Sequence, residues 1–226
     1  MTSWLDQLDE RGYARTGRLL SPRAAAELAG AFDDDQRYRS RVQMGRYRFG
    51  EGDYAYFAYP LPPAVQRLRE ELYPPLAAVA NEWAERLGAD DRELWPDDLD
   101  SMLARCHAAG QRRPTPLVLR YGEGGYNTLH QDLYGDVAFP LQVVVGLTEP
   151  GVDYTGGEFV LTEQRPRSQT RATALPLVRG EGIVFPNNRR PVQGGRGPYQ
   201  VTHRHGASEV RSGVRVALGI IFHDAR

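Results

Sequence analysis

The sequence predicts a mainly β fold with helices, in which a β-sandwich or jelly-roll barrel is supported by helices from the first half of the chain. Near residue 113 the pattern changes from helical apolar spacing to short runs rich in Val, Ile, Leu, Phe and Thr, separated by Gly, Pro and Asn. The 226 residues, 41% of them hydrophobic, suffice for one large core. We therefore expect a single domain over residues 1–226, with 1–110 mainly helical and 111–226 forming the barrel that carries the functional site.

Three helical regions are predicted in the first half. Ser21 as N-cap and Pro22 at the first helical position indicate a helix over residues 21–32. Apolar residues at three-and-four spacing from Val65 to Leu87 predict two helices, separated at Pro74-Pro75 and ending at Gly88. A further helix fits residues 97–109, with Gly110 as its stop.

Six strands are predicted in the second half, over residues 115–121, 139–147, 158–162, 173–178, 182–185 and 214–222. Residues 164–171 and 187–198 separate strands and are expected to be loops at the barrel mouth. The aromatic run Tyr54, Tyr56, Phe57 and Tyr59 fits either an alternating strand or a wall on which a substrate stacks. We leave it out of the site, because aromatic runs are more often core.

Composition narrows the classes of protein. No stretch approaches the roughly 18 apolar residues of a membrane span, and the polar start lacks a signal-like apolar run, so we expect a cytoplasmic protein that does not bind membranes. Cys106 is the single cysteine, so a metal site must use nitrogen and oxygen ligands. The chain has no lysine, so any buried cation that binds a carboxylate must be arginine.

The net charge of −1 conceals an asymmetry between the two halves. Residues 1–110 hold 14 Arg against 19 Asp and Glu, whereas residues 160–215 hold 10 Arg against 3 Glu. The basic half either faces an anionic substrate or pairs with the acidic half within the fold, and we favour the second interpretation. The arginines at 165, 167 and 171 are likewise interpreted as a solvated loop.

The strongest functional signal is His130-Gln131-Asp132, which places two metal-binding side chains on one face of a strand. The pair needs a third ligand, which His205 supplies just before a predicted strand. His203 competes for this role, and the spacing to Arg215 favours His205. Two histidines and one carboxylate form the facial triad of Fe(II) oxygenases, which leaves positions open for a 2-oxo acid and dioxygen. Arg215, ten residues after His205, is the candidate for the distal carboxylate of that acid.

These residues resemble known families. The His-x-Asp pair, the distal His205 and Arg215 in Val210-Arg211-Ser212-Gly213-Val214-Arg215 look like the prolyl-4-hydroxylase branch of 2-oxoglutarate oxygenases. Residues 120–132 are similar to the AlkB nucleic-acid dealkylases, and this match implies that Tyr121 hydrogen-bonds 2-oxoglutarate. Leu119 stands where AlkB proteins carry a 2-oxoglutarate-contacting Asn.

Nearly the whole chain resembles a bacterial family of such oxygenases that is described as acting on damaged DNA. Residues 110–117 and 222–225 are further stretches that carry this resemblance. The resemblance implies a double-stranded β-helix fold, a cupin-like jelly roll, with Fe(II), 2-oxoglutarate and O2 as cofactor and co-substrates.

Three functions remain open. We favour a dioxygenase that oxidises a C–H bond of a small metabolite, amino acid or peptide residue, with release of succinate and CO2. This preference rests on the near-neutral charge and on the lack of an evident basic and aromatic stripe. The alternatives are oxidative dealkylation of nucleobases in DNA or RNA, and a non-catalytic barrel that only binds metal or ligand. The sequence does not indicate an oligomeric state.

Overall fold

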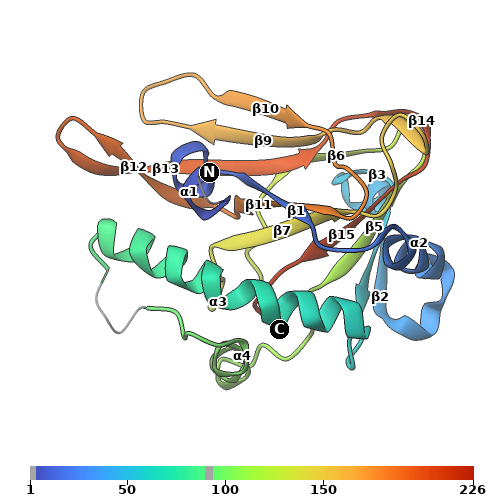
Figure 1. Cartoon of the computed structure of the whole chain (residues 1–226), viewed down its shortest axis with the longest axis horizontal. Helices are drawn as coiled ribbons and strands as arrows, with labels where there is room; N and C mark the ends of the chain where they lie inside the picture. Colours follow the sequence, from blue (N-terminus) through green and yellow to red (C-terminus); the bar gives the residue numbers. More distant parts are fainter. Residues whose placement is uncertain (1–3, 90–93) are drawn as a thin grey trace.

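The computed structural model describes residues 4–89 and 94–226. Its strands form two antiparallel sheets, and the helices cover the outer face of the larger one (Figure 1). The α-helices are α1 (Trp4–Arg11), α2 (Pro22–Gly30), α3 (Pro63–Arg86) and α4 (Leu99–Ala108). Short 3-10 turns lie at Ala31–Asp33, Asp35–Arg37 and Met44–Tyr47.

The larger sheet has seven strands in the order β1-β11-β7-β15-β5-β4-β2. Their bounds are β1 (Ala14–Arg18), β11 (Glu181–Pro186), β7 (Leu141–Gly146), β15 (Arg215–Ile220), β5 (Leu117–Tyr121), β4 (Asp53–Phe57) and β2 (Tyr38–Gln43).

The smaller sheet has six strands, in the order β10-β9-β13-β6-β3 with β12 also paired to β13. Their bounds are β10 (Arg171–Leu175), β9 (Phe159–Gln164), β13 (Gly197–Ala207), β6 (Tyr126–His130), β3 (Gly50–Glu51) and β12 (Arg189–Gly194). A separate pair is formed by β8 (Tyr154–Gly156) and β14 (Val210–Gly213).

From β5 onward the chain alternates between the sheets, with β5, β7, β11 and β15 in the larger sheet and β6, β9 and β13 in the smaller one. This winding is that of a jelly roll, as predicted. Among the described strands no pairing joins the two sheets into a closed barrel. The inner face of the larger sheet lies toward the smaller sheet, and its outer face lies toward the helices.

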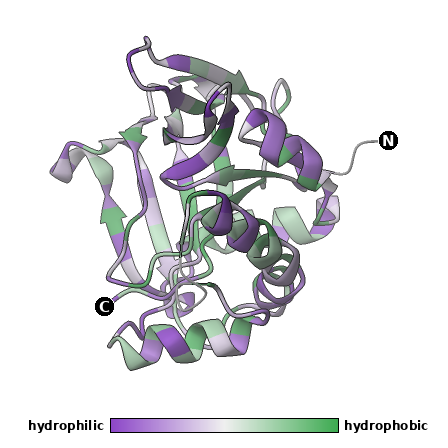
Figure 2. Cartoon of the chain, turned by 90° about the vertical axis from the view of Figure 1, so that its left-hand side faces the viewer, coloured by the Kyte–Doolittle hydropathy of each residue, from purple (hydrophilic) through white to green (hydrophobic). Residues whose placement is uncertain are grey.

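Alternation along the strands of the larger sheet divides the core into two parts. Val143 and Val145 on β7 pack toward α3 and α4, whereas Val144 between them faces the smaller sheet with Phe159 and Phe185. Successive side chains of a strand point to opposite faces, so a fully apolar strand can serve both layers. Figure 2 shows mixed hydrophobic and hydrophilic residues along the helices, as expected for helices with one face buried.

The helices lie where they were predicted, but one predicted break between helices is wrong. Ser21 caps α2 by accepting a hydrogen bond from the Ala24 amide, and α4 lies within the predicted range. The predicted break at Pro74-Pro75 does not occur, because α3 is one helix with both prolines inside it. Buried residues on both sides of the prolines, including Leu72 and Leu76, hold it against the core and offset the missing hydrogen bonds.

The six predicted strands are all present, with ends that shift by one to three residues. Strands β1 to β3 were not predicted, and β4 was only one of two interpretations of the aromatic run. Residues 1–110 therefore supply strands to both sheets as well as helices. The loop expected at residues 187–198 is wrong, because β12 and the start of β13 form a hairpin there. Residues 165–170 do form a loop between β9 and β10. Among the described residues, no helix combines the length and hydrophobicity needed to span a bilayer.

Candidate functional site

A pocket of about 260 Å³ lies between the two sheets, and it collects every candidate site residue. His130, Asp132, His205, Tyr121 and Arg215 all line it. The smaller sheet supplies the two histidines from β6 and β13, and the larger sheet supplies Tyr121 and Arg215 from the paired strands β5 and β15. Residues 75 or more positions apart in the sequence therefore meet through strand pairing.

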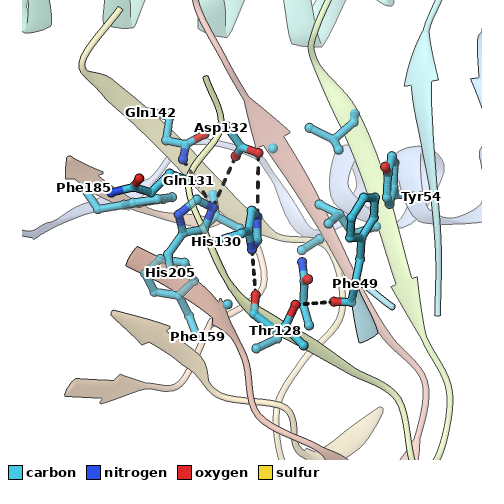
Figure 3. A pocket seen from close by; sticks show the side chains of 18 of the residues that line it. Phe49, Tyr54, Thr128, His130, Gln131, Asp132, Gln142, Phe159, Phe185 and His205 are labelled. Carbon is cyan, nitrogen blue, oxygen red and sulfur yellow. Dashed lines mark hydrogen bonds and ion pairs between the residues drawn. The ribbon is translucent and has the colours of Figure 1, made fainter. Parts of the chain in front are cut away.

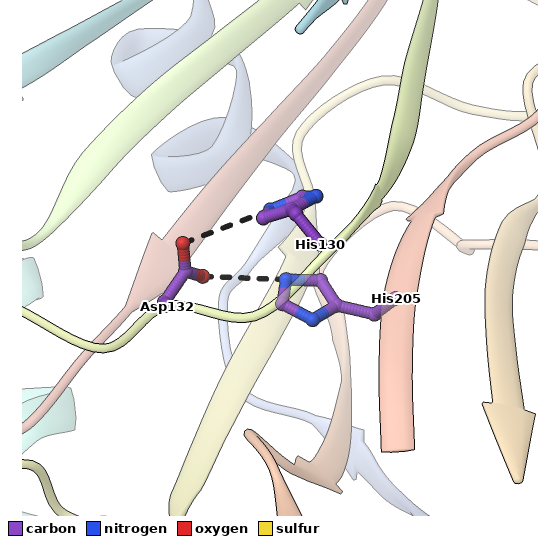
Figure 4. A group of neighbouring side chains, drawn as sticks. All are labelled: His130, Asp132 and His205. Carbon is purple, nitrogen blue, oxygen red and sulfur yellow. Dashed lines mark ion pairs between the residues drawn. The ribbon is translucent and has the colours of Figure 1, made fainter. Parts of the chain in front are cut away.

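His130, Asp132 and His205 form a compact group whose ligand atoms all lie within 4.8 Å of one another (Figure 4). His205 Nε2 lies 3.2 Å from Asp132 Oδ2, and His130 Nε2 lies 3.6 Å from Asp132 Oδ1. His130 and His205 are direct cross-strand partners. The prediction placed His130 and Asp132 on the same strand. In the structure β6 ends at His130, and Asp132 lies just beyond it. Its backbone turns so that the carboxylate still faces both rings.

Hydrogen bonds fix the orientation of this group (Figure 3). His130 Nδ1 lies 2.7 Å from the Thr128 carbonyl oxygen, which can only accept, so Nδ1 carries a hydrogen and Nε2 is the nitrogen directed toward Asp132. The Asp132 amide donates to Asn187 Oδ1 at 2.7 Å, and Asn187 Nδ2 donates back to the Asp132 carbonyl. The backbone of the carboxylate is therefore held on both sides.

The electrostatics set the protonation states that metal binding requires. Burial raises the pKa of Asp132, but the hydrogen bond and charge of His205, with His130, outweigh burial and hold this pKa well below its usual range. Burial, with His130 nearby, lowers the pKa of His205. Asp132 is thus an ionised carboxylate with an imidazole nitrogen within 3.6 Å of each oxygen. The donor set therefore fits a divalent metal ion bound by two nitrogens and one oxygen.

Arg215 forms the second feature of the pocket. Its side chain is buried, its Nε has no hydrogen-bond partner, and in the described part of the chain it makes no ion pair. Its guanidinium carbon lies 5.2 Å from the centre of the Tyr121 ring. Gly157 makes room for it, because a Cβ there would lie 2.8 Å from Arg215 Cδ. An unpaired buried cation is costly, so this end of the pocket fits an anionic ligand.

Tyr121 is a hydrogen-bond donor beside this arginine. Burial raises its pKa to about 12, although Arg215 acts in the opposite direction, so the phenol stays protonated near neutral pH. Asn127 Nδ2 donates to the Tyr121 oxygen at 3.2 Å, which leaves the phenol hydrogen free for a ligand. Asn127 was not predicted. It faces inward together with His130 because the register of β6 shifts between them, as in a β-bulge.

His203, the competing candidate, lies outside the pocket. It is buried on β13. Arg190 of the neighbouring strand β12 donates through Nε to the His203 Nε2 at 3.2 Å, and Glu163 lies 3.9 Å from the same nitrogen. Burial, with Arg190, lowers its pKa to about 4. The structure therefore brings His205, and not His203, to His130 and Asp132.

The interpretation of the aromatic run as core is only partly right. Phe57 is buried in the main core, whereas Tyr54 and Tyr56 line the pocket. Phe49 and Tyr134 line the same side. The alternation of β4 gave a signal for this split, because Tyr54 and Tyr56 share one face and Ala55 and Phe57 the other.

Comparison with known proteins agrees with this geometry. Residues 52–225 match the family described as "Oxygenase, catalysing oxidative methylation of damaged DNA". The protein MT2286 of Mycobacterium tuberculosis is 53% identical over 169 residues, which cover 75% of this chain and 72% of the relative.

Two solved structures share the fold. An oxidoreductase of the 2OG-Fe(II) oxygenase family from Burkholderia pseudomallei superposes with a TM-score of 0.55 at 14% identity, covering 98% of this chain and 90% of the other. A prolyl hydroxylase from Trichoplax adhaerens, in complex with a peptide fragment of hypoxia inducible factor, gives 0.55 at 15% identity, covering 98% and 88%.

The fold is thus that of the 2-oxoglutarate- and Fe(II)-dependent oxygenases, whose cofactor and co-substrates are Fe(II), 2-oxoglutarate and O2. The chain belongs to the oxygenase family that matches residues 52–225. The prediction of an oxygenase with a double-stranded β-helix fold is confirmed at the level of family and fold.

Proposed function

We propose that the protein is a cytoplasmic dioxygenase that oxidises a C–H bond of its substrate while converting 2-oxoglutarate to succinate and CO2. His130, Asp132 and His205 hold the iron, and Arg215 with Tyr121 binds the distal carboxylate of 2-oxoglutarate. The observation that supports this most is the presence, in one pocket, of a three-donor metal group and a buried arginine that has no ion-pair partner among residues 4–89 and 94–226.

The residues of this chain prepare the site before any ligand binds. Thr128 holds the His130 tautomer, Asn187 holds the backbone of Asp132, and Asn127 leaves the Tyr121 hydrogen free to donate. The bound iron supplies the redox chemistry that couples 2-oxoglutarate and dioxygen to C–H oxidation. Phe159 and Phe185 pack near His205 and keep water from that side of the site.

For the substrate we propose a small metabolite, amino acid or peptide residue. The pocket of about 260 Å³ must hold both 2-oxoglutarate and the reacting group, so only a small group enters it. Tyr54 and Tyr56 form an aromatic wall on the open side, and their phenols can orient a polar group. The Trichoplax prolyl hydroxylase, which shares the fold, was solved in complex with a peptide fragment, and this supports a peptide as one candidate substrate class.

A nucleobase in damaged DNA is the second candidate, and one specific observation favours it. Tyr47 and Phe49 stack at 5.6 Å with an angle of 19° between their rings, and both are exposed beside the pocket. Arg46 and Arg48 alternate with them and are also exposed. Residues 46–49 therefore form a short segment of alternating basic and aromatic side chains, although no such pattern was predicted from the sequence. The description of the family also names damaged DNA.

A coupled assay separates the two candidates. Succinate release is measured with amino acids, short peptides, and single-stranded oligonucleotides carrying methylated bases. Small-molecule or peptide substrates raise turnover above the substrate-free rate, independently of salt. If oligonucleotides alone do so, with an apparent affinity that falls steeply with salt and is lost in Phe49→Ala, the second candidate replaces the first. A wild-type protein without any 2-oxoglutarate turnover would indicate a non-catalytic barrel.

A further inference from the structure

Asp132 has a contact that neither metal nor 2-oxoglutarate binding accounts for. The Tyr134 hydroxyl donates to Asp132 Oδ1 at 2.6 Å, a short, charge-assisted hydrogen bond. The other oxygen, Oδ2, faces His205 Nε2 at 3.2 Å. Both oxygens face an imidazole, since His130 Nε2 lies 3.6 Å from Oδ1, but Oδ1 alone also accepts a hydrogen bond from a phenol.

The hydrogen bond continues away from the carboxylate. Tyr56 donates its hydroxyl hydrogen to Tyr134 Oη at 3.1 Å, and the two rings meet edge to face at 6.3 Å. Because Tyr134 accepts from Tyr56, its own hydrogen is directed toward Asp132.

The loop that carries Tyr134 is itself fixed. Gln111 is fully buried, and its Nε2 lies 3.0 Å from the Tyr134 carbonyl, 2.9 Å from the Val137 carbonyl and 2.6 Å from the Asp224 carbonyl. Its Oε1 accepts from the Val137 amide at 2.8 Å. Gln111 and Asp224 lie in the two stretches, 110–117 and 222–225, that the oxygenase activity itself does not explain. They attach the loop to the body of the fold.

We infer that Tyr134 is a positioning residue that restricts Asp132 to binding the metal through Oδ2 alone. A carboxylate that binds through both oxygens occupies two coordination positions of an octahedral metal. One of these positions is then lost to 2-oxoglutarate or dioxygen. The phenol disfavours this second contact because it donates a hydrogen bond to Oδ1. Tyr56 and Gln111 hold the phenol in place. This inference rests on the proposed role of Asp132 as a metal ligand.

The test compares Tyr134→Phe with the wild type and with Tyr73→Phe as a matched control. Tyr73 is also a buried phenol, whose hydroxyl donates to the Pro96 carbonyl at 2.9 Å in the main core. Anaerobic titration with Co(II) gives the metal affinity, and the visible band formed with Fe(II) and 2-oxoglutarate reports the coordination of the metal.

Tyr134→Phe is expected to weaken Co(II) binding by about 10- to 100-fold and to shift the visible band. Tyr73→Phe is expected to retain the wild-type affinity and band. Unchanged affinity and band in Tyr134→Phe would overturn the inference. If this variant does not fold, Tyr56→Phe replaces it, with a smaller loss expected in the same direction and the wild-type result again overturning the inference. A wild-type protein that binds no metal would instead overturn the proposed function itself.

Discussion

At the scale of single residues, the site depends on which nitrogen and which oxygen each side chain presents. Thr128 fixes the His130 ring, Asn187 fixes the Asp132 backbone, and the strand register places His205 opposite His130. The spacing to Arg215 favoured His205 over His203, and the structure brings His205 to His130 and Asp132, whereas His203 contacts Arg190.

This distinction gives the first prediction. His205→Ala removes a nitrogen donor from the three-residue group and should abolish Fe(II) binding and 2-oxoglutarate turnover. His203→Ala should leave Fe(II) affinity intact, because its side chain lies outside the pocket, although stability will fall where Arg190 and Glu163 lose their neighbour. Metal content after dialysis and succinate release are the measurements. Loss of metal in His203→Ala alone would reverse the assignment.

Arg215 carries the second prediction. Arg215→Gln keeps a polar side chain but removes the charge, and should raise the Kd of 2-oxoglutarate by about 10- to 100-fold, the equivalent of a lost charge-assisted hydrogen bond. Metal binding should be unaffected, because Arg215 belongs to a different part of the pocket. Titration of the metal-loaded protein with 2-oxoglutarate measures both. An unchanged Kd would place the co-substrate carboxylate elsewhere.

The sequence predicted those residues whose chemistry is tied to a fixed spacing: His130, Asp132, His205 and Arg215. It did not reveal Asn127, Gln142, Asn187 or Tyr134, because their roles arise only when separate strands and loops come together. Asn127 illustrates the reason. Regular alternation places residues 127 and 130 on opposite faces, and only the register shift in β6 turns both into the pocket.

At the scale of elements, a buried ion pair connects helix α3 to the end of the chain. Arg69 and Asp224 are fully buried and meet at 2.9 Å. Arg69 also donates to the carbonyls of Ile221 and Phe222 and to the Tyr59 hydroxyl. The helix thereby fixes the segment after β15, which includes the Asp224 carbonyl that Gln111 contacts.

The third prediction follows from this pair. Arg69→Met preserves much of the side-chain volume but removes the buried guanidinium from Asp224, which keeps the His107 ring at 3.1 Å and the Tyr59 hydroxyl. It should lower the free energy of unfolding by about 3–5 kcal/mol. Urea unfolding followed by circular dichroism measures the change. The double variant Arg69→Met with Asp224→Asn should recover part of the loss, since no buried charge remains. A single variant as stable as the wild type would contradict this role for the pair.

At two places the local sequence pattern predicted the wrong secondary structure. Pro74-Pro75 predicted a break, but contacts on both sides of the prolines kept α3 continuous. The Gly-rich and Pro-rich sequence at 187–198 looked like a loop, yet it forms the β12–β13 hairpin, in which Pro191 is paired at the sheet edge. In both cases tertiary contacts outweighed local propensity.

At the scale of the whole molecule, the jelly roll was predictable because it needs only a series of short apolar runs with turns between them. The contribution of residues 14–57 to the sheets was not, since strands β1 to β4 are short or mixed in polarity and gain stability only by pairing with the later strands. The basic character of residues 160–215 is partly neutralised by acidic residues outside that segment, since Arg179 pairs with Glu149 and Asp153, and Arg211 pairs with Glu158.

The fourth prediction concerns the pH dependence of global stability. Burial lowers the pKa of His223 to about 4, and its Nδ1 accepts a hydrogen bond from the Phe139 amide at 3.1 Å. In the unfolded chain its pKa is near 6.5. The unfolded state therefore binds more protons between these values, and stability falls as the pH falls from about 6.5 to about 4.

The expected loss between pH 7 and pH 5 from this residue is on the order of 2 kcal/mol. His223→Asn keeps an acceptor for the Phe139 amide without a titrating ring, and should reduce the slope of this part of the stability profile. It should not remove the slope, because burial lowers the pKa of His203 to about 4 as well. Urea unfolding at a series of pH values measures it. A variant with the same slope as the wild type would show that His223 is not the group responsible.

The central claim is that His130, Asp132 and His205 hold the iron of a 2-oxoglutarate-dependent oxygenase. Anaerobic protein is mixed with Fe(II) and 2-oxoglutarate, the weak visible charge-transfer band is recorded, and succinate is measured after oxygen is admitted, with Asp132→Ala as the control. We predict a band and succinate in the wild type and neither in the variant. A folded wild-type protein that gives no band and no succinate, or an Asp132→Ala variant that gives both, would contradict the claim.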